Sequence, residues 1–140
     1  MFQYIKMIWQ ALIGSETIRQ GVYPTSADGV AALAVTLTAA AAWTWGAWAQ
    51  IVAATAAKCQ IESFTLENIV GGPLQGEVAI ASGAGGFEVE LGRWPVVSPY
   101  YRLAKPIEVQ AGVRLAARLR TSTGVADTVD IKLCVTTGYE

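Results

Sequence analysis

KPIEVQAGVRLAARLR, residues 105–120, is the stretch that decides the fold. Apolar and polar residues alternate on both sides of Ala111–Gly112. Because the side chains of a β-strand point to opposite faces in turn, this pattern predicts two half-buried strands joined by a tight turn. Pro106 cannot donate a backbone hydrogen bond and suits the start of a strand, and Gly112 can adopt a positive φ where the chain reverses. After the turn, the apolar face comprises Val113, Leu115, Ala117 and Leu119, and the other face carries Arg114, Arg118 and Arg120.

The same alternation recurs in the rest of the chain from Leu33 onward. Turn residues separate eight such segments at regular spacing, which is typical of an antiparallel sandwich or barrel. A change of phase near Ser63–Phe64 predicts a β-bulge. For residues 30–140 we therefore expect an all-β domain, an eight-stranded antiparallel jelly-roll sandwich. The expected strands are Leu33–Ala40, Gly46–Thr55, Cys59–Ile69, Leu74–Ala81, Phe87–Trp94, Arg102–Gln110, Val113–Thr121 and Val125–Val135.

Residues 1–29 differ from this pattern and predict an N-terminal arm followed by a linker. Apolar residues recur at a spacing of three to four over Met1–Gln20, which predicts a helix with Gly14 as a candidate stop. Turn-forming residues dominate 21–29 and predict the linker. The arm either packs on its own domain or docks on a neighbouring subunit, because it has few charges to keep a free face in water.

Composition limits what the chain can do. It has 140 residues, enough for about one domain, of which 53% are hydrophobic and only 15% charged. So much apolar surface indicates that some faces contact partners rather than water. No run of about 20 uncharged apolar residues is present to span a membrane, and a net charge of −1 provides no field for nucleic acid. The start of the chain lacks the basic residues and cleavage site of a secretory signal.

The residues needed for catalysis are missing or isolated. The absence of histidine removes the commonest general base and the commonest metal ligand. The glycines of Gly83–Gly86 precede a predicted strand rather than a helix, so they indicate a hairpin turn and not a phosphate site. Glu88 and Glu90 share one strand face, as glycosidase carboxylates can, but nothing else completes such a site. We therefore expect no enzyme activity, no cofactor and no metal.

Cys59 and Cys134 form no CxxC motif, which argues against zinc or redox chemistry. In a jelly roll the third and eighth strands are antiparallel neighbours, and these cysteines lie near the start of one and the end of the other. A cross-strand disulfide is therefore geometrically feasible. The alternative, which we favour for a protein made in a reducing cytosol, is two reduced and mainly apolar side chains.

Arg114, Arg118 and Arg120 form a basic stripe, with Arg102 and Lys105 near the same end. The stripe either contacts nucleic acid phosphates or forms ion pairs within the fold or across a subunit contact. We favour ion pairs, because the chain has 10 basic and 11 acidic residues. The candidate acidic partners are Glu88, Glu90, Glu108 and Asp130.

Aromatic residues gather in two segments, Trp43–Trp48 and Trp94–Tyr101. They suit either a sugar-stacking platform or anchors of a core or an interface, where tryptophan and tyrosine contribute much of the binding energy. Strand alternation places Trp43 and Trp45 on one face and Trp48 on the other, which argues against a single flat platform.

Three of these segments resemble a loose family of small tailed-bacteriophage virion proteins with a β-sandwich core. The resemblance covers about Leu33–Val135, and its best part is KPIEVQAGVRLAAR, residues 105–118. The other segments are GAW with IVAAT over 46–55, and GAGGFE over 83–88. Members of this family decorate or cement heads, or serve as head, collar or tail accessory modules. The resemblance implies no catalytic residues and does not extend to residues 1–29.

From the resemblance we expect a virion structural protein, made in the host cytoplasm, that acts as a capsid decoration or cement protein and stabilises neighbouring major capsid subunits. The alternative is a tail or collar accessory or receptor-binding module with a carbohydrate-binding β-sandwich. Expected partners are the major capsid protein or other virion proteins and further copies of the chain, as a trimer, with neither nucleic acid nor membrane. The expected interface residues are Phe2, Ile5, Ile8, Trp9, Trp43, Trp45, Trp94, Arg114 and Arg118.

Overall fold

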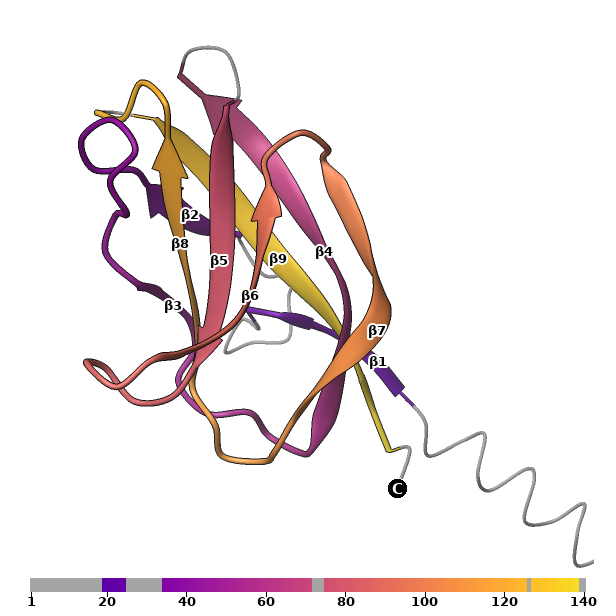
Figure 1. Cartoon of the computed structure of the whole chain (residues 1–140). Coiled ribbons are helices and arrows are strands. Elements are labelled where there is room, and N and C mark those ends of the chain that lie inside the picture. The colour runs from indigo at the N-terminus through magenta and orange to yellow at the C-terminus, as the bar shows by residue number, and fades with distance from the viewer. Residues whose placement is uncertain (1–18, 25–33, 72–74, 126, 139–140) are drawn as a thin grey trace, which may run out of the picture.

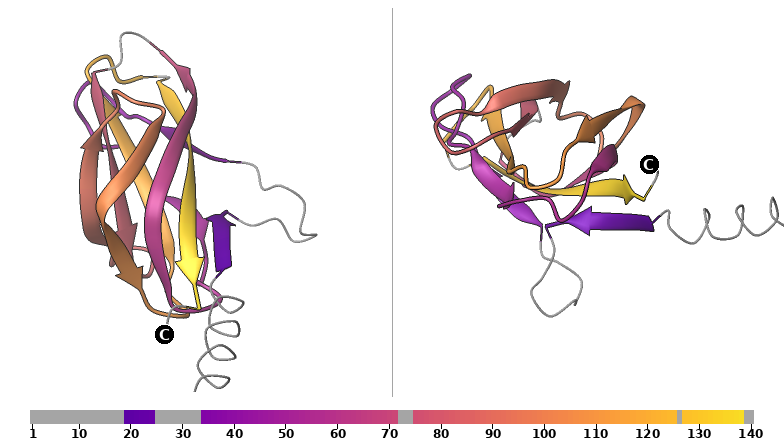
Figure 2. Two further views of the ribbon diagram at one scale, coloured as in Figure 1. Left: turned by 90° about the vertical axis from the view of Figure 1, so that its right-hand side faces the viewer. Right: turned by 90° about the horizontal axis from the view of Figure 1, so that it is seen from below.

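The computed structural model of the protein describes residues 19–24, 34–71, 75–125 and 127–138. These residues form two antiparallel sheets packed face to face, and no helix occurs among them (Figures 1 and 2). The predicted all-β sandwich is thus confirmed. The strands are β1 (Arg19–Tyr23), β2 (Val35–Thr38), β3 (Ala49–Val52), β4 (Cys59–Val70), β5 (Gly76–Ser82), β6 (Val89–Pro95), β7 (Tyr100–Val109), β8 (Leu115–Thr121) and β9 (Thr128–Thr137).

The order of strands brings distant parts of the chain together. One sheet, here named sheet A, has the order β1-β9-β4-β7, and β2 also pairs with β9. The other, sheet B, has the order β3-β8-β5-β6. The β-bulge predicted near Ser63–Phe64 is confirmed, since the register of β4 shifts between Ile61 and Ser63 against both neighbours.

The stretch that opened the sequence analysis forms β7 and β8, but these strands belong to different sheets. The turn between them carries the chain from one layer to the other, with Gly112 at φ 75°. Buried Thr55 holds this turn: its hydroxyl donates to the Gln110 carbonyl at 2.6 Å and accepts from the Val113 N–H at 3.2 Å. The Gly112 N–H donates to the Thr55 carbonyl at 2.8 Å. These three hydrogen bonds fix the turn to the side chain and backbone of Thr55.

The prediction of eight strands is wrong, because the described residues contain a ninth strand, β1. It pairs with β9 from Arg19↔Thr137 to Tyr23↔Leu133, so the predicted helix does not extend to Gln20 and the predicted linker does not begin at Gly21. Tyr23 is buried, and its hydroxyl accepts a hydrogen bond from the Ala56 N–H at 3.3 Å. Turn-forming residues in this segment concealed the strand. The rest of the predicted helix lies outside the described residues.

The strand predicted over Gly46–Thr55 begins only at Ala49. Residues 39–48 run as a loop beside β8, where the Trp43 N–H donates to the Thr121 carbonyl at 2.7 Å and the Gly46 N–H to the Leu119 carbonyl at 2.9 Å. Gly46 approaches the chain so closely that a Cβ there would lie 1.8 Å from the Thr38 carbonyl oxygen. This close contact requires glycine and holds the loop against the sandwich.

The core lies between the inner faces of the two sheets. Phe64 is fully buried at its centre. Its ring meets the Trp94 ring edge-on at 5.0 Å and stacks with the Tyr101 ring at 5.1 Å. These three rings join β4, β6 and β7 and so close the sandwich on its β6–β7 side.

Candidate functional site

The outer face of sheet B carries alternating tryptophan and arginine side chains, here named the Arg–Trp ladder. The guanidinium carbon of Arg118 lies 4.2 Å from the centre of the Trp48 ring and 4.7 Å from that of the Trp45 ring. That of Arg120 lies 4.6 Å from the Trp45 ring and 6.0 Å from the Trp43 ring. Each contact is attractive, by about 0.5–1 kcal/mol at an exposed site. Each of these arginines therefore links two tryptophans.

The ladder covers a strip of alanines. Ala79, Ala81 and Ala116 belong to the outer face of sheet B and not to the core cluster, yet at most 1% of each is exposed. Ala79 lies between Arg118 on β8 and Arg93 on β6. Long arginine side chains can bury their apolar stems along such small residues while the charged ends stay near water. The strip thus forms a second, thin apolar layer outside the main core.

Arg120 of the ladder and the neighbouring Arg93 are also paired with acids. The Arg120 Nη2 donates to both Glu77 carboxylate oxygens at 3.1 Å. The Arg93 Nε donates to Glu90 Oε1 at 2.6 Å, and its guanidinium carbon lies 5.4 Å from the Trp45 ring. These bonds fix the orientation in which the guanidinium groups meet the tryptophan rings.

Arg114 forms one of the ion pairs predicted from the sequence, with Glu88. Its Nη1 lies 3.1 Å from Glu88 Oε1 and also donates to the Gly83 carbonyl, while its Nε donates to Gln50 Oε1 at 3.0 Å. The pKa of the Glu88 carboxyl is lowered, mainly because the backbone N–H of Glu88 donates a hydrogen bond to it. The Gly86 N–H and Arg114 lower this pKa further, and desolvation partly opposes the change. The β5–β6 turn is thereby tied to β8.

Arg118 differs from the prediction. It forms no ion pair among the described residues, and its Nε is buried without a hydrogen-bond acceptor. The two tryptophan rings that enclose it take the place that an acid was expected to occupy. Two other predicted acidic partners bind elsewhere: Glu108 pairs with Lys58 at 3.2 Å, and Asp130 accepts from Thr36 at 2.7 Å.

The tryptophans also depart from strand alternation. Trp43, Trp45 and Trp48 all contact the same arginine column, because residues 39–48 form a loop in which Trp43 has φ 54°. The prediction that Trp48 faces away from the other two is wrong. Trp94 points inward and packs against Phe64. Trp45 and Trp48 are thus partly covered by arginines and Trp94 by the core, whereas Trp43 remains 51% exposed.

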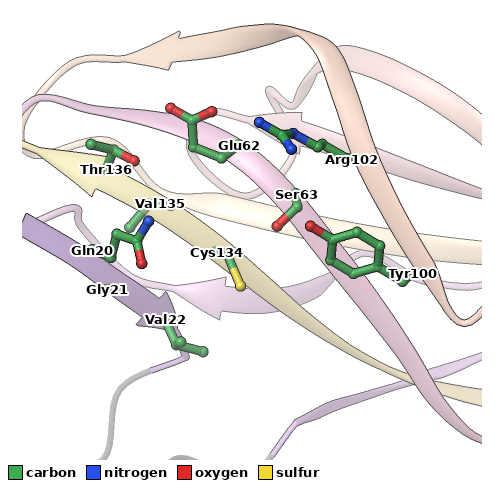
Figure 3. Close-up of a pocket in the computed structure, with 10 residues that line it drawn as sticks. All are labelled: Gln20, Gly21, Val22, Glu62, Ser63, Tyr100, Arg102, Cys134, Val135 and Thr136. Atoms are coloured by element: carbon green, nitrogen blue, oxygen red, sulfur yellow. The ribbon is translucent and has the colours of Figure 1, made fainter.

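A different hollow lies on the outer face of sheet A, here named the groove (Figure 3). Its volume is about 580 Å³, within the range of small-molecule sites. Figure 3 shows Ser63 and Cys134 between the β7 side chains and those of β1. The groove crosses β1, β9, β4 and β7 and is lined by Gln20, Gly21, Val22, Glu62, Ser63, Tyr100, Arg102, Cys134, Val135 and Thr136.

The sequence forms the groove by placing small residues between large ones. Ser63 lies opposite Cys134 and opposite Arg102, so the floor of the groove follows one cross-strand row. The bulge at Glu62 interrupts pairing, and the partner of β4 changes from Ile107 to Arg102 within two residues. β7 therefore departs from β4 over the intervening residues. The sequence signal for this hollow was the phase change near Ser63, which predicted a bulge but not a site.

The register between β4 and β9 determines where the two cysteines lie. β4 and β9 are antiparallel neighbours, as predicted, but Cys59 lies opposite Thr137 and Cys134 opposite Ser63. Cys59 faces the core and Cys134 faces the groove, and both thiols are free. The cross-strand disulfide considered from the sequence does not form, because the two side chains lie on opposite faces of sheet A; the structure has the two free thiols that we favoured. Burial raises the pKa of the Cys59 thiol.

The remaining predicted interface residues, Phe2, Ile5, Ile8 and Trp9, lie outside the described residues. Within the described part of the chain, no group of three or more acidic or cysteine side chains is placed to hold a metal ion. No helix in that part is long and apolar enough to cross a membrane. Comparison of the chain with protein-family models and with curated proteins gives no match.

Proposed function

We propose that the protein is a non-enzymatic structural protein of a tailed-bacteriophage virion, and that it acts as a capsid decoration or cement protein. The strand order supports a jelly roll, the finer form of the sandwich. Sheets of order β2-β9-β4-β7 and β3-β8-β5-β6 are those of a jelly roll whose eight strands begin at β2. β1 then pairs with Leu133–Thr137 of β9, whereas β2 pairs with Thr128–Ile131 of the same strand.

The observation that carries this proposal is the set of large apolar side chains exposed at the turns and edges of a complete sandwich. Phe87 is 80% exposed, Val125 78% and Val97 73%. The core between the sheets does not use them. Exposed apolar side chains on several turns suit a protein that contacts more than one neighbour. Trp43, Val70 and Val89 belong to the same exposed set.

The mechanism we propose is clamping by many weak contacts. β6 and β7 are edge strands, each with one side unpaired in the described structure, and such edges are commonly covered by another chain. Copies arranged with capsid symmetry would add their weak contacts through a high effective concentration. Among the residues expected at the interface, Trp43 remains the best placed in the described part, since it is 51% exposed.

The experiment is performed on particles of the phage whose genome encodes this chain. Purified protein is added to particles from which it has been removed, and its copies per particle and the temperature of genome release are measured. We expect stoichiometric binding and a higher release temperature. Particles that release their genome at the same temperature with and without the protein would rule out clamping.

Substitutions and a deletion can show which part of the protein contacts the capsid. Phe87→Ser and Val125→Ser should weaken attachment without unfolding the sandwich, because both side chains are exposed. Thr123→Ser, a conservative change in the same turn as Val125, is the matched control. Deletion of residues 1–18, which leaves β1 intact, tests the arm. Unchanged attachment of the truncated protein would show that the arm is not the anchor.

The alternative, a tail or collar receptor-binding module with a carbohydrate site, is favoured by one observation. The groove collects polar side chains on an open sheet face, whereas the ladder tryptophans are occupied by arginines. Labelling the protein on intact particles and imaging them distinguishes the two locations: signal over the whole head supports decoration, and signal at the tail alone contradicts it.

A further inference from the structure

We propose that the groove on sheet A binds a neutral saccharide. The inference does not depend on where in a virion the protein sits. It rests on the polar side chains that converge there without partners, on one exposed aromatic ring, and on the position of the groove on a sheet face.

The polar side chains of the groove have unused hydrogen-bonding capacity. Among the described residues, the side chains of Gln20, Glu62, Arg102 and Thr136 form no hydrogen bond or ion pair, and the same holds for the Tyr100 hydroxyl. The Ser63 hydroxyl, on a residue that is 5% exposed, also has no hydrogen-bond partner among the described residues. Polar groups that water can reach bind water in the free protein. A polar ligand seated in the groove can replace that water and use the same donors and acceptors.

The charges indicate a neutral ligand. Glu62 and Arg102 line the groove together, from the neighbouring strands β4 and β7. Their opposite charges offset one another, so the groove has no net charge that would favour an anion or a cation. A sugar hydroxyl both donates and accepts, so a carboxylate and a guanidinium can each bind one.

Tyr100 provides a surface for the apolar face of a sugar ring. Its side chain is 51% exposed, and Figure 3 shows its ring at the β7 side of the groove, near Ser63. Exposed tyrosine rings combine a large apolar area with a polar tip and are well suited to such contacts. Gln20 and Thr136 lie on the opposite side of Ser63 and Cys134 (Figure 3). A sugar unit between the two sides would meet an aromatic ring and hydrogen-bonding groups together.

A peptide fits the groove less well than a saccharide. An extended peptide adds to a sheet through the unpaired backbone groups of an edge strand. The groove instead crosses a face, and its β9 and β4 residues belong to strands that are paired on both sides. Side chains must then provide the polar contacts, as in a saccharide site. The volume of about 580 Å³ can hold one or two sugar units.

Cys134 allows a direct test in the full-length protein. Its thiol lines the groove, whereas Cys59 is fully buried and serves as an internal control. The rate of alkylation of each thiol by iodoacetamide is measured by peptide mass spectrometry. The probes are maltohexaose, cellohexaose, laminarihexaose and chitohexaose at millimolar concentration. We expect at least one of them to slow alkylation of Cys134 and none to change that of Cys59.

Substitutions in the groove then test whether the saccharide that protects Cys134 binds there. Tyr100→Ala and Arg102→Ala should each weaken binding of the protecting hexasaccharide by about tenfold, measured by calorimetry. Tyr100→Phe retains the ring and should weaken it less than Tyr100→Ala. Trp43→Ala, on the ladder, is the control and should leave binding unchanged. Thermal unfolding of each variant verifies that the sandwich is intact.

Two results would overturn the proposal. The first is that none of the four hexasaccharides protects Cys134. Protection by heparin hexasaccharide in their place, lost at high salt, would then indicate an anion site. The second is binding that is unchanged in the Tyr100→Ala and Arg102→Ala variants, whether or not Trp43→Ala removes it. Attachment to capsids is a separate measurement, so failure here leaves the proposed virion role untouched.

Discussion

The outer faces of the two sheets contain similar residue types, but these side chains interact with one another on sheet B, whereas in the groove of sheet A they form no hydrogen bond or ion pair among the described residues. On sheet B, arginines, acids and aromatic rings contact one another, and the alanines beneath them are buried. On sheet A, Glu62, Arg102 and Tyr100 line one groove, yet none of their side chains forms a hydrogen bond or ion pair among the described residues. Side chains that contact one another contribute to stability, whereas polar groups without protein partners remain available for a ligand. The comparison therefore separates a face that supports the fold from a face that we propose to bind a ligand.

The largest change in stability is expected on the outer face of sheet B. Trp45→Ala removes the ring that Arg93, Arg118 and Arg120 all approach, and it uncovers the alanine strip. We expect the free energy of unfolding to fall by about 2 kcal/mol. Urea denaturation measures it, with Tyr100→Ala as the control from the other face. Equal losses of unfolding free energy in Trp45→Ala and Tyr100→Ala would contradict the distinction between the two faces.

A smaller effect is expected for Arg118→Met. Methionine keeps much of the apolar stem over Ala79 but removes the charge between Trp45 and Trp48. We expect a loss of about 1 kcal/mol, because no ion pair is broken. A double-mutant cycle with Trp48→Ala should show a coupling energy of similar size. Additive losses would mean that the guanidinium contributes nothing to the ladder.

The third prediction concerns pH. The folded structure lowers the pKa of the Glu88 carboxyl from its ordinary value of 4.5, so ionised Glu88 stabilises the fold above that value. This stabilisation is lost as the pH falls below the ordinary value and through the lowered one. Glu88→Gln should therefore reduce the dependence of unfolding free energy on pH in the acid range. Urea denaturation at a series of pH values, with Gln60→Ala as a control, measures it, and parallel wild-type and Glu88→Gln curves would contradict it.

The smallest effect on stability is expected in the groove. Arg102→Ala and Thr136→Ala break no side-chain hydrogen bond or ion pair within the described residues, so each should change the unfolding free energy by less than about 0.5 kcal/mol. Thermal and urea unfolding measure this change. A loss above 1 kcal/mol, roughly that of a typical hydrogen bond, would show that these side chains support the fold after all.

Much of the architecture followed from alternation. The two strands around Gly112 and the bulge before Ser63 were predicted, because half-buried strands impose a period of two on the sequence. The pairing of β4 with β9 was predicted from the strand order of a jelly roll. The same rule failed at Trp43–Trp48, where backbone hydrogen bonds to β8 hold a loop without strand geometry. It also missed β1, because Arg19 and Gln20 were assigned to the predicted helix and residues 21–23 to the predicted linker.

The candidate site was harder to predict than the fold. The pairing of Arg114 with Glu88 was expected from charge balance, but the enclosure of Arg118 by two tryptophans depends on a loop conformation that no local pattern reveals. The groove depends on which residues meet across four strands. Ser63 and Cys134 lie far apart in sequence and form its floor only after β4 pairs with β9.

The pairing of β1 with β9 has a practical consequence. Since Arg19 lies opposite Thr137, the described chain starts and stops at one corner of the sandwich, away from the end of the sandwich at which β4 ends and β5 begins (Figure 1). A fluorophore attached at Arg19 or at Gly138 will lie at that corner. Labels at these two positions of one molecule will report a short separation.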